Sequence, residues 1–203
     1  MSKQKITIMP STSGYNLAAA DYDKKEKYLN SFEKDKLIPL LGDVRGKTIL
    51  DVGAGTGRAS VILAKMGAAV TALDVSEQML KELKKKNPKV QTVIGDAESL
   101  PFPDKSFDAV VAAFLIVHLK DPTRFFDEAY RVLKDGGMLV VSNINQKEPP
   151  EVKTPAGAIK IESYYHRPEK IRGVLESLAY DIKNEIFVKE NDVWVNQIIA
   201  AQK

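Results

Sequence analysis

The 203-residue chain contains no cysteine, two histidines and one tryptophan. Without cysteine, disulfides, thiolate metal sites and cysteine nucleophiles are excluded. No stretch approaches the ~18 consecutive apolar residues of a membrane-spanning helix, and residues 1–10 lack the apolar core of a signal peptide. Charge of one sign is also scarce, since 30 lysines and arginines against 27 acidic residues leave a net charge of +3. We therefore expect a cytoplasmic protein without nucleic-acid or membrane partners.

The composition is that of a globular protein, with 44% hydrophobic and 28% charged residues. The length suits one domain with a sizeable core. The densest basic run lies on a predicted helix and its exit, and a run of this kind is usually a solvated face. That run consists of Lys81, Lys84, Lys85, Lys86 and Lys89.

From Gly46 onward, short apolar runs alternate with amphipathic segments, a pattern that predicts a parallel sheet covered by helices. The predicted strands are residues 48–52, 69–73, 90–94, 107–114 and 138–142, followed by an antiparallel pair at 182–188 and 193–200. Residues 146–157 contain three prolines and are predicted to form a loop. The fold class predicted is a doubly wound α/β domain over residues 46–203.

Upstream of this domain, residues 1–45 are predicted to form a helical extension. Leu29, Phe32, Leu37 and Leu40 give residues 22–41 a helical pattern, and Pro39 is expected to bend its end. The extension is too short for a second domain. We expect it to fold over the sheet edge where ligands bind.

A glycine-rich turn joins the first strand to the helix after it, where backbone N–H groups can approach a ligand closely. Three interpretations compete. The dinucleotide fingerprint G-x-G-x-x-G requires a third glycine, but Arg58 occupies that position. The phosphate loop of nucleotide triphosphatases ends in G-K-[ST], which is absent. The third interpretation is the pattern present here, Gly53-x-Gly55-x-Gly57 preceded by Asp51. The glycines alone do not separate a binding site from a tight turn without a ligand.

Two acidic residues favour a binding site. Asp51 stands two positions before Gly53, where a carboxylate can attract the ammonium group of S-adenosylmethionine, a cofactor with no pyrophosphate. Asp74 follows the second strand, where an acid can accept hydrogen bonds from both ribose hydroxyls. Proteins that bind NAD share the second acid, so it indicates a nucleoside without identifying it.

Three segments in this order carry a family resemblance. Residues 49–57, Ile-Leu-Asp-Val-Gly-Ala-Gly-Thr-Gly, resemble motif I of the class I methyltransferases. Residues 95–108 and 131–139 resemble the segments after the third strand and before the fifth strand of the broad family that includes ubiquinone and menaquinone biosynthesis methyltransferases. The resemblance covers residues 15–200 and implies the seven-stranded Rossmann-like methyltransferase fold, mostly parallel with its last strand antiparallel. It departs at Leu178-Ala179-Tyr180, where the family has an Ala-Gly-Phe turn.

The resemblance implies S-adenosylmethionine as the cofactor and assigns its contacts. The methionine and ribose parts are expected at Gly53, Ala54, Gly55 and Gly57, with Asp51 at the amino group and Asp74 at the ribose. Val75 and Met79 are expected on the adenine ring, with Asp96 and Ala97 at its exocyclic amine. Ala113 and Phe114 are expected near the methionine part, with Tyr15 and Tyr22 closing over the cofactor or simply packing the extension.

Methyl transfer is an in-line displacement that requires alignment and exclusion of water, and a base only for acceptors that must lose a proton. His118 follows the fourth strand and is the candidate base; its alternative role is to pack near Asp121. His166 is a candidate acceptor contact, and its alternative is an exposed position at a helix start. No metal site is expected, since Asn143 and Asn145 have no acidic partners at suitable spacing.

The sequence thus predicts an S-adenosylmethionine-dependent methyltransferase acting on O, N or C of a small molecule. A protein or RNA acceptor, docked on the lysine-rich face, and a binding module without turnover are the alternatives. Arg58 disfavours a nicotinamide oxidoreductase. Residues 113–116 lack the N/D-P-P-Y/F motif of amino-methyltransferases, and cytosine C5 chemistry has no cysteine to use. The acceptor and the oligomeric state are not specified.

Overall fold

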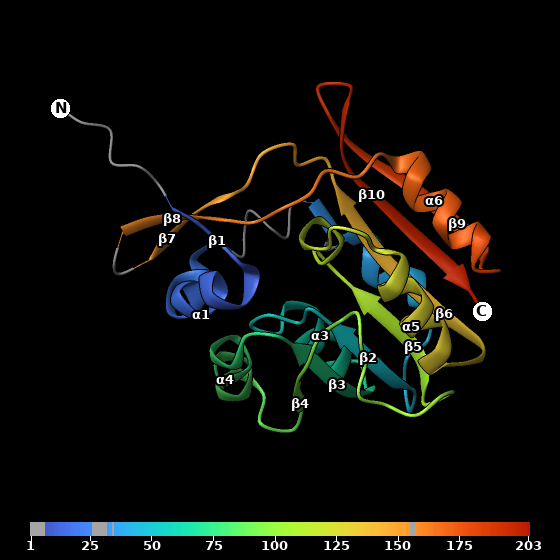
Figure 1. Ribbon diagram of the computed structural model, residues 1–203. Coiled ribbons are helices and arrows are strands. Elements are labelled where there is room, and N and C mark those ends of the chain that lie inside the picture. Colours follow the sequence, from blue (N-terminus) through green and yellow to red (C-terminus); the bar gives the residue numbers. More distant parts are fainter. Residues whose placement is uncertain (1–6, 26–31, 34, 155–156) are drawn as a thin grey trace.

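The computed structural model describes residues 7–25, 32–33, 35–154 and 157–203. A seven-stranded sheet runs through it in the order β4-β3-β2-β5-β6-β10-β9 (Figure 1). Its strands are β2 (Thr48–Val52), β3 (Ala69–Asp74), β4 (Gln91–Ile94), β5 (Phe107–Ala112), β6 (Leu133–Ile144), β9 (Asp181–Glu190) and β10 (Val193–Gln202). The longer helices are α1 (Ser11–Tyr22), α3 (Arg58–Lys65), α4 (Glu77–Lys86), α5 (Thr123–Val132) and α6 (Pro168–Ser177).

The topology confirms the predicted fold class. β4, β3, β2, β5 and β6 pair in parallel, and β10 is antiparallel to both β6 and β9. The closing antiparallel pair is therefore confirmed as well. The fifth predicted strand, expected at residues 138–142, is longer in the structure because β6 begins at Leu133, directly after α5 ends, and passes through the two glycines expected to end that helix.

Both faces of the sheet are buried, as the continuous apolar runs predicted. Along β2, Leu50 and Val52 belong to a cluster with α5 and α6, whereas Ile49 belongs to a cluster with α3 and α4. This alternation follows from the two-residue period of a strand. Phe125 of α5 and Leu63 of α3, one on each side, have no solvent exposure. The core thus fixes the strand ends that carry the predicted site.

A second, small sheet was not predicted. It contains β1 (Ile8–Met9), β8 (Gly157–Ile161) and β7 (Glu151–Thr154), in that order. Ala18 of α1 packs against Val152 and Ile161 of this sheet, and Figure 1 shows α1 between the small sheet and α4. β7 lies within residues 146–157, which were expected to be a loop. The prolines flank β7 and do not interrupt it.

The N-terminal extension agrees with the prediction in part. The helix α1 precedes the predicted one, and residues 32–33 and 35–37 of the predicted helix are helical as well. Of residues 22–41, residues 26–31 and 34 lie outside the described residues, and the end is the 3-10 turn η2 (Ile38–Leu41), which contains Pro39. The buried positions of α1 are Gly14, Ala18 and Ala19, which are too small to give a clear apolar stripe.

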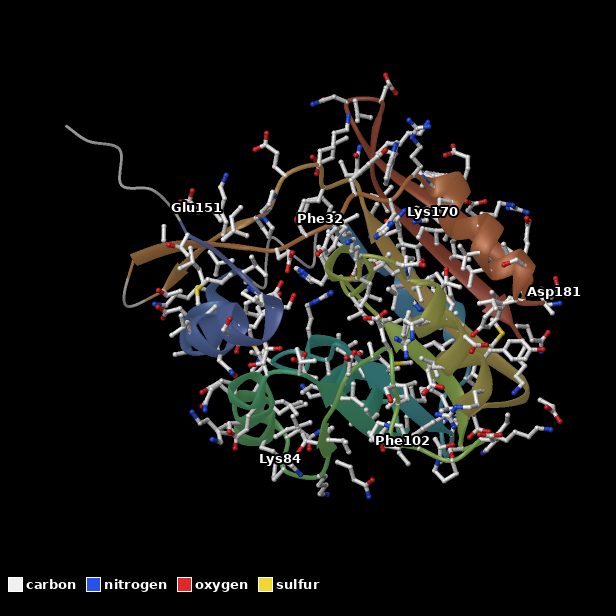
Figure 2. All side chains as sticks on the ribbon, in the orientation of Figure 1. Phe32, Lys84, Phe102, Glu151, Lys170 and Asp181 are labelled. Atoms are coloured by element: carbon white, nitrogen blue, oxygen red, sulfur yellow. The ribbon has the colours of Figure 1, made fainter. Side chains whose placement is uncertain are left out.

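The lysines of the basic run are exposed, as expected for a solvated face, and Figure 2 shows Lys84 projecting from the outer side of α4. Lys81 and Lys85 form ion pairs with acidic residues of the same helix. Within the described ranges, no helix has both the length and the apolar character needed to cross a bilayer.

Candidate functional site

The glycine loop after β2 lies at the carboxyl ends of the parallel strands, where ligands bind in open α/β sheets. The Gly53 and Ala54 N–H groups donate to the Leu73 carbonyl oxygen at 2.8 and 3.0 Å, which ties the loop to the end of β3. Gly55 has φ +56°, and a Cβ placed on it would meet no atom within 4 Å. Its backbone therefore faces open space.

That space is a cavity of about 560 Å³, part of it open to solvent. The predicted residues in its lining are Tyr15, Tyr22, Gly53, Gly55, Asp74, Val75, Met79, Ala97, Ala113, Phe114 and His118. We call it the main cavity. Most of the residues that the sequence assigned to cofactor binding therefore meet around one space.

Asp74 is held at the wall of the main cavity by its neighbours. Its Oδ2 accepts from the Gly55 N–H and its Oδ1 from the Ser76 N–H, both at 2.8 Å. Burial raises the pKa of Asp74, while hydrogen bonds from the Ser76, Gly55 and Val75 N–H groups oppose that effect. A carboxylate has about four acceptor positions, so Asp74 can still accept from a ligand hydroxyl.

A smaller adjoining cavity of about 370 Å³ is lined by Asp51, Ala54, Thr56 and Arg58, and shares Gly53, Gly55, Tyr22, Ala113 and Phe114 with the main cavity. Asp51 is only 2% exposed, and its Oδ2 accepts from the Ser60 hydroxyl at 2.6 Å. Burial raises the pKa of Asp51 to about 6. At neutral pH it is a buried negative charge beside the cavity, suited to a cationic ligand group.

The hydroxyl of Tyr15 lies 2.7 Å from His118 Nε2, and His118 Nδ1 lies 2.9 Å from the carbonyl oxygen of Glu162. Because a carbonyl oxygen only accepts, Nδ1 carries the ring proton and Nε2 accepts from Tyr15. Burial lowers the pKa of His118 and raises that of Tyr15 well above its usual value. The pair is therefore a neutral tyrosine donating to a neutral histidine at pH 7.

Beyond this pair lies a third cavity, of about 630 Å³. Tyr15, Tyr22, Phe114 and His118 line both it and the main cavity, so these four side chains form a shared wall. Its other lining residues are Phe32, Val117, Ile144, Gln146, Pro150 and Val152. We call it the apolar cavity, because Gln146 is the only one of those six with a polar side chain.

Phe114, in the shared wall, has a strained backbone. Its φ is +60°, a left-handed conformation that is unfavourable for an aromatic residue. The Ser142 hydroxyl oxygen accepts from its N–H at 2.9 Å, and its ring makes an edge contact with Phe32. Strain of this kind persists only where the surroundings hold it and is concentrated at functional sites.

Three predicted residues lie elsewhere. A Cβ on Gly57 would come within 2.0 Å of Leu83 Cδ1, so Gly57 faces α4. Asp96 is exposed and accepts from the Glu98 N–H, although its neighbour Ala97 lines the main cavity. His166 is 3% exposed, which also departs from its alternative of an exposed helix start. Its Nε2 donates to a backbone carbonyl oxygen away from the described cavities.

Several lining residues were not predicted from the sequence. Arg58 was considered only as a departure from the dinucleotide fingerprint, not as a residue of the site. The apolar cavity was missed because Pro150 and Val152 lie in the segment expected to be a loop. In β8, the alternation of Ile159 and Ile161 was a weak local signal for this strand. Among the residues the structure describes, no cluster of His, Asp or Glu is placed to hold a metal ion.

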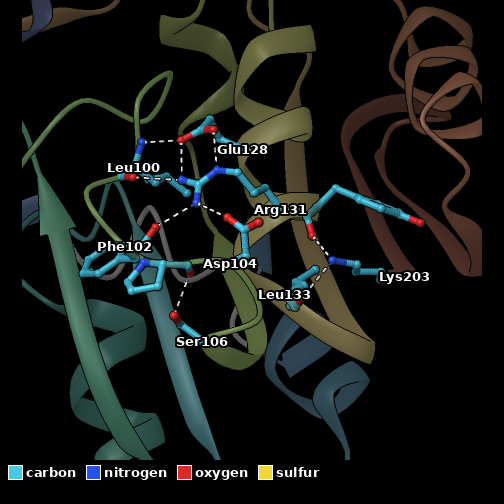
Figure 3. A network of polar contacts seen from close by, with 10 residues as sticks. Leu100, Phe102, Asp104, Ser106, Glu128, Arg131, Leu133 and Lys203 are labelled. Carbon is cyan, nitrogen blue, oxygen red and sulfur yellow. Dashed lines mark hydrogen bonds and ion pairs between the residues drawn. The ribbon is translucent and has the colours of Figure 1, made fainter.

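The loop that follows Ala97 is held by Arg131 of α5 (Figure 3). The guanidinium donates to the carbonyl oxygens of Leu100 and Phe102 at 3.0 and 2.8 Å, and pairs with Asp104 and Glu128. Glu128 in turn accepts from the Leu100 N–H at 2.7 Å. This network fixes the loop on which one side of the main cavity depends.

Comparison with known proteins agrees with this geometry. Residues 50–141 match the family model described as methyltransferase domain. The chain is similar to demethylmenaquinone methyltransferase of Renibacterium salmoninarum, 42% identical over 109 residues, 54% of this chain and 46% of that protein. It is similar to 2-methyl-6-phytyl-1,4-hydroquinone methyltransferase of a Synechocystis strain, 41% identical over 111 residues, 53% of this chain and 35% of that protein.

The chain spans about half the length of the demethylmenaquinone methyltransferases that it matches. Among solved structures, an S-adenosylmethionine-dependent methyltransferase from Mesorhizobium loti has a TM-score of 0.74. It is 19% identical, and the match covers 86% of this chain and 100% of that one. At that identity the likeness concerns the fold.

Proposed function

We propose that the chain is a class I S-adenosylmethionine-dependent methyltransferase, which the family match, the similar proteins and the shared fold support, and that it transfers a methyl group to an apolar, hydroxyl-bearing small molecule. The observation that carries this proposal is the wall of Tyr15, Tyr22, Phe114 and His118 shared by the main and apolar cavities. A donor in one cavity and an acceptor in the other meet at that wall.

The residues of the main cavity fit S-adenosylmethionine, which supplies an electrophilic methyl group when bound. Gly55 leaves room for a ligand against the backbone, and Asp74 can still accept a hydrogen bond from a ribose hydroxyl. Val75 and Met79 offer apolar contact to the adenine ring. The buried Asp51 carboxylate is suited to the ammonium group.

The lining of the apolar cavity sets the acceptor class. Phe32, Val117 and Ile144 favour a hydrophobic ring or hydrocarbon chain, and Gln146 offers one polar contact. Two relatives are named for demethylmenaquinone and for 2-methyl-6-phytyl-1,4-hydroquinone, acceptors of this type. An alkylated hydroquinone is therefore the first acceptor to test.

Tyr15 and His118 provide a route for the proton that the acceptor hydroxyl must lose. As that proton passes to the Tyr15 oxygen, the tyrosine's own proton passes to His118 Nε2, the unprotonated nitrogen of the neutral ring. The resulting oxyanion attacks through oxygen or through the adjacent ring carbon. The hydrogen bond from Nδ1 to the Glu162 carbonyl stabilises the imidazolium that forms, which later releases its proton to water.

Methyl transfer is measured by the release of S-adenosylhomocysteine with an alkylated hydroquinone and, separately, with polar acceptors such as glycine and nicotinamide. We expect turnover with the hydroquinone. His118→Ala should lower kcat by about 10²–10⁴-fold, and Tyr15→Phe should also lower it. Tyr164→Phe is the matched control, because that exposed hydroxyl bonds only the Glu162 side chain.

Two other results would contradict the proposal. Methylation of protein or RNA in a cell extract, without methylation of small acceptors, would indicate a macromolecular acceptor. Binding of S-adenosylhomocysteine without any turnover would indicate a binding module. Unchanged turnover in His118→Ala would remove the histidine as a base and leave the cavity assignment standing.

A further inference from the structure

Arg58, the first residue of α3, has a partly buried guanidinium and lines the smaller cavity beside the main one. Its side chain is 17% exposed and forms an ion pair with Glu33, whose side chain is 1% exposed. The guanidinium carbon also lies 5.4 Å from the centroid of the Phe114 ring. Removing a guanidinium from water is costly, so an arginine in such a place requires partners that compensate for the lost hydration.

The pairing with Glu33 uses only part of that guanidinium. Arginine presents five N–H donors in a fixed planar fork, and Nη2 is the atom that pairs with Glu33 Oε2. The other carboxylate oxygen, Oε1, is buried and has no hydrogen-bond partner within the described structure. Glu33 therefore holds the guanidinium from one side, with donors left on its other edge.

Arg58 lines the smaller cavity with Asp51. Among the described residues that line this cavity and the main one, Arg58 is the only arginine or lysine. The methionine end of S-adenosylmethionine carries both an ammonium and a carboxylate. Asp51 suits the ammonium, whereas the carboxylate needs a cation with hydrogen-bond donors.

We propose that the free edge of the Arg58 guanidinium binds the carboxylate of the cofactor's methionine end, in the cavity that it lines with Asp51. This inference rests on the proposed function. It makes Glu33 a positioning residue, which holds the arginine in place through its buried carboxylate. It also explains why a partly buried cation directly follows the glycine loop, where no cation is needed to make the turn.

The test compares two ligands that differ in the carboxylate alone. S-adenosylhomocysteine carries it, and the decarboxylated analogue, S-adenosyl-3-thiopropylamine, keeps the adenosine, thioether and ammonium. Their dissociation constants are measured by calorimetry for wild type, Arg58→Met and Arg58→Lys. Arg45→Met is the matched control, since Arg45 forms an exposed pair with Asp43.

We expect Arg58→Met to weaken S-adenosylhomocysteine binding by about 10- to 100-fold and to leave binding of the analogue unchanged. Arg58→Lys keeps the charge without the planar fork, so its affinity for S-adenosylhomocysteine should lie between those of wild type and Arg58→Met. Arg45→Met should bind both ligands as wild type does. Retained binding of the analogue shows at the same time that the variant is folded.

Equal weakening of both ligands by Arg58→Met would overturn the assignment, because a structural role predicts that result. Full retention of S-adenosylhomocysteine affinity would overturn it as well. Failure of the wild type to bind either ligand would instead contradict the proposed function. The two failures are therefore distinguishable.

Discussion

Two glycines of the loop after β2 should respond differently to alanine. Gly55 and Gly57 both have positive φ, +56° and +85°, so each alanine adopts a conformation that costs about 1–2 kcal/mol. At Gly55 the new methyl group meets nothing within 4 Å, whereas at Gly57 it comes within 2.0 Å of Leu83 Cδ1. Leu83 is fully buried, so the leucine must move or the loop must shift, at about 1–3 kcal/mol.

We therefore expect Gly55→Ala to lower the free energy of unfolding by about 1–2 kcal/mol and Gly57→Ala by about 2–5 kcal/mol. Binding should show the opposite order, because Gly55 faces the main cavity and Gly57 faces α4. Folded Gly57→Ala should bind S-adenosylhomocysteine with an affinity closer to that of wild type than Gly55→Ala does. The assays are urea unfolding followed by far-UV circular dichroism, and calorimetry.

Gly173→Ala is the control for the substitution itself. Gly173 lies within α6, and its added Cβ would meet no atom within 4 Å. Alanine there should stabilise the protein by about 0.5–1 kcal/mol, the usual gain over glycine inside a helix. Equal destabilisation by Gly55→Ala and Gly57→Ala would refute the packing of the loop against Leu83.

Three further predictions concern single side chains. Burial raises the pKa of Asp51 to about 6, so the folded state loses stability as Asp51 ionises between about pH 4 and pH 6. In urea unfolding across this range, the free energy of unfolding of Asp51→Asn should rise relative to that of wild type by up to about 3 kcal/mol. Arg131→Met should lower the free energy of unfolding by about 2 kcal/mol and increase hydrogen exchange in residues 98–104, since Glu128 and two carbonyl oxygens lose their partner. His166→Ala should cost about 2 kcal/mol in the same unfolding assay, with S-adenosylhomocysteine affinity unchanged, because His166 bonds the Leu119 carbonyl oxygen away from the cavities.

Much of the fold is predictable from the sequence because the large sheet has strong local signals. β5 is apolar almost throughout, as a strand covered on both faces must be. The elements that cover the site, α1 and the small sheet of β1, β8 and β7, have no signal of that strength. α1 buries Gly14 and two alanines, and Gly14 allows Ile161 of β8 to approach within 3.1 Å of where its Cβ would be. Close packing of small residues depends on the partner element, which a single segment does not reveal.

The site follows the same division. Asp51 and Asp74 are placed by strand ends, so sequence spacing predicts where they lie. The bond between Tyr15 and His118 joins residues 103 positions apart, and no periodicity indicates it. Asp96 and Gly57 match the motif in sequence, yet Asp96 is exposed and Gly57 faces α4, because neighbouring residues in a turn point in different directions. The role of Arg58 depends on its ion pair with Glu33, 25 positions upstream, which the sequence does not indicate.

The most direct test of the whole account is calorimetric titration of the wild-type protein with S-adenosylhomocysteine and, separately, with NADH. The account predicts saturable binding of S-adenosylhomocysteine with a stoichiometry of about one, strongly weakened by Asp74→Ala, and no binding of NADH. Binding of NADH without binding of S-adenosylhomocysteine would contradict it.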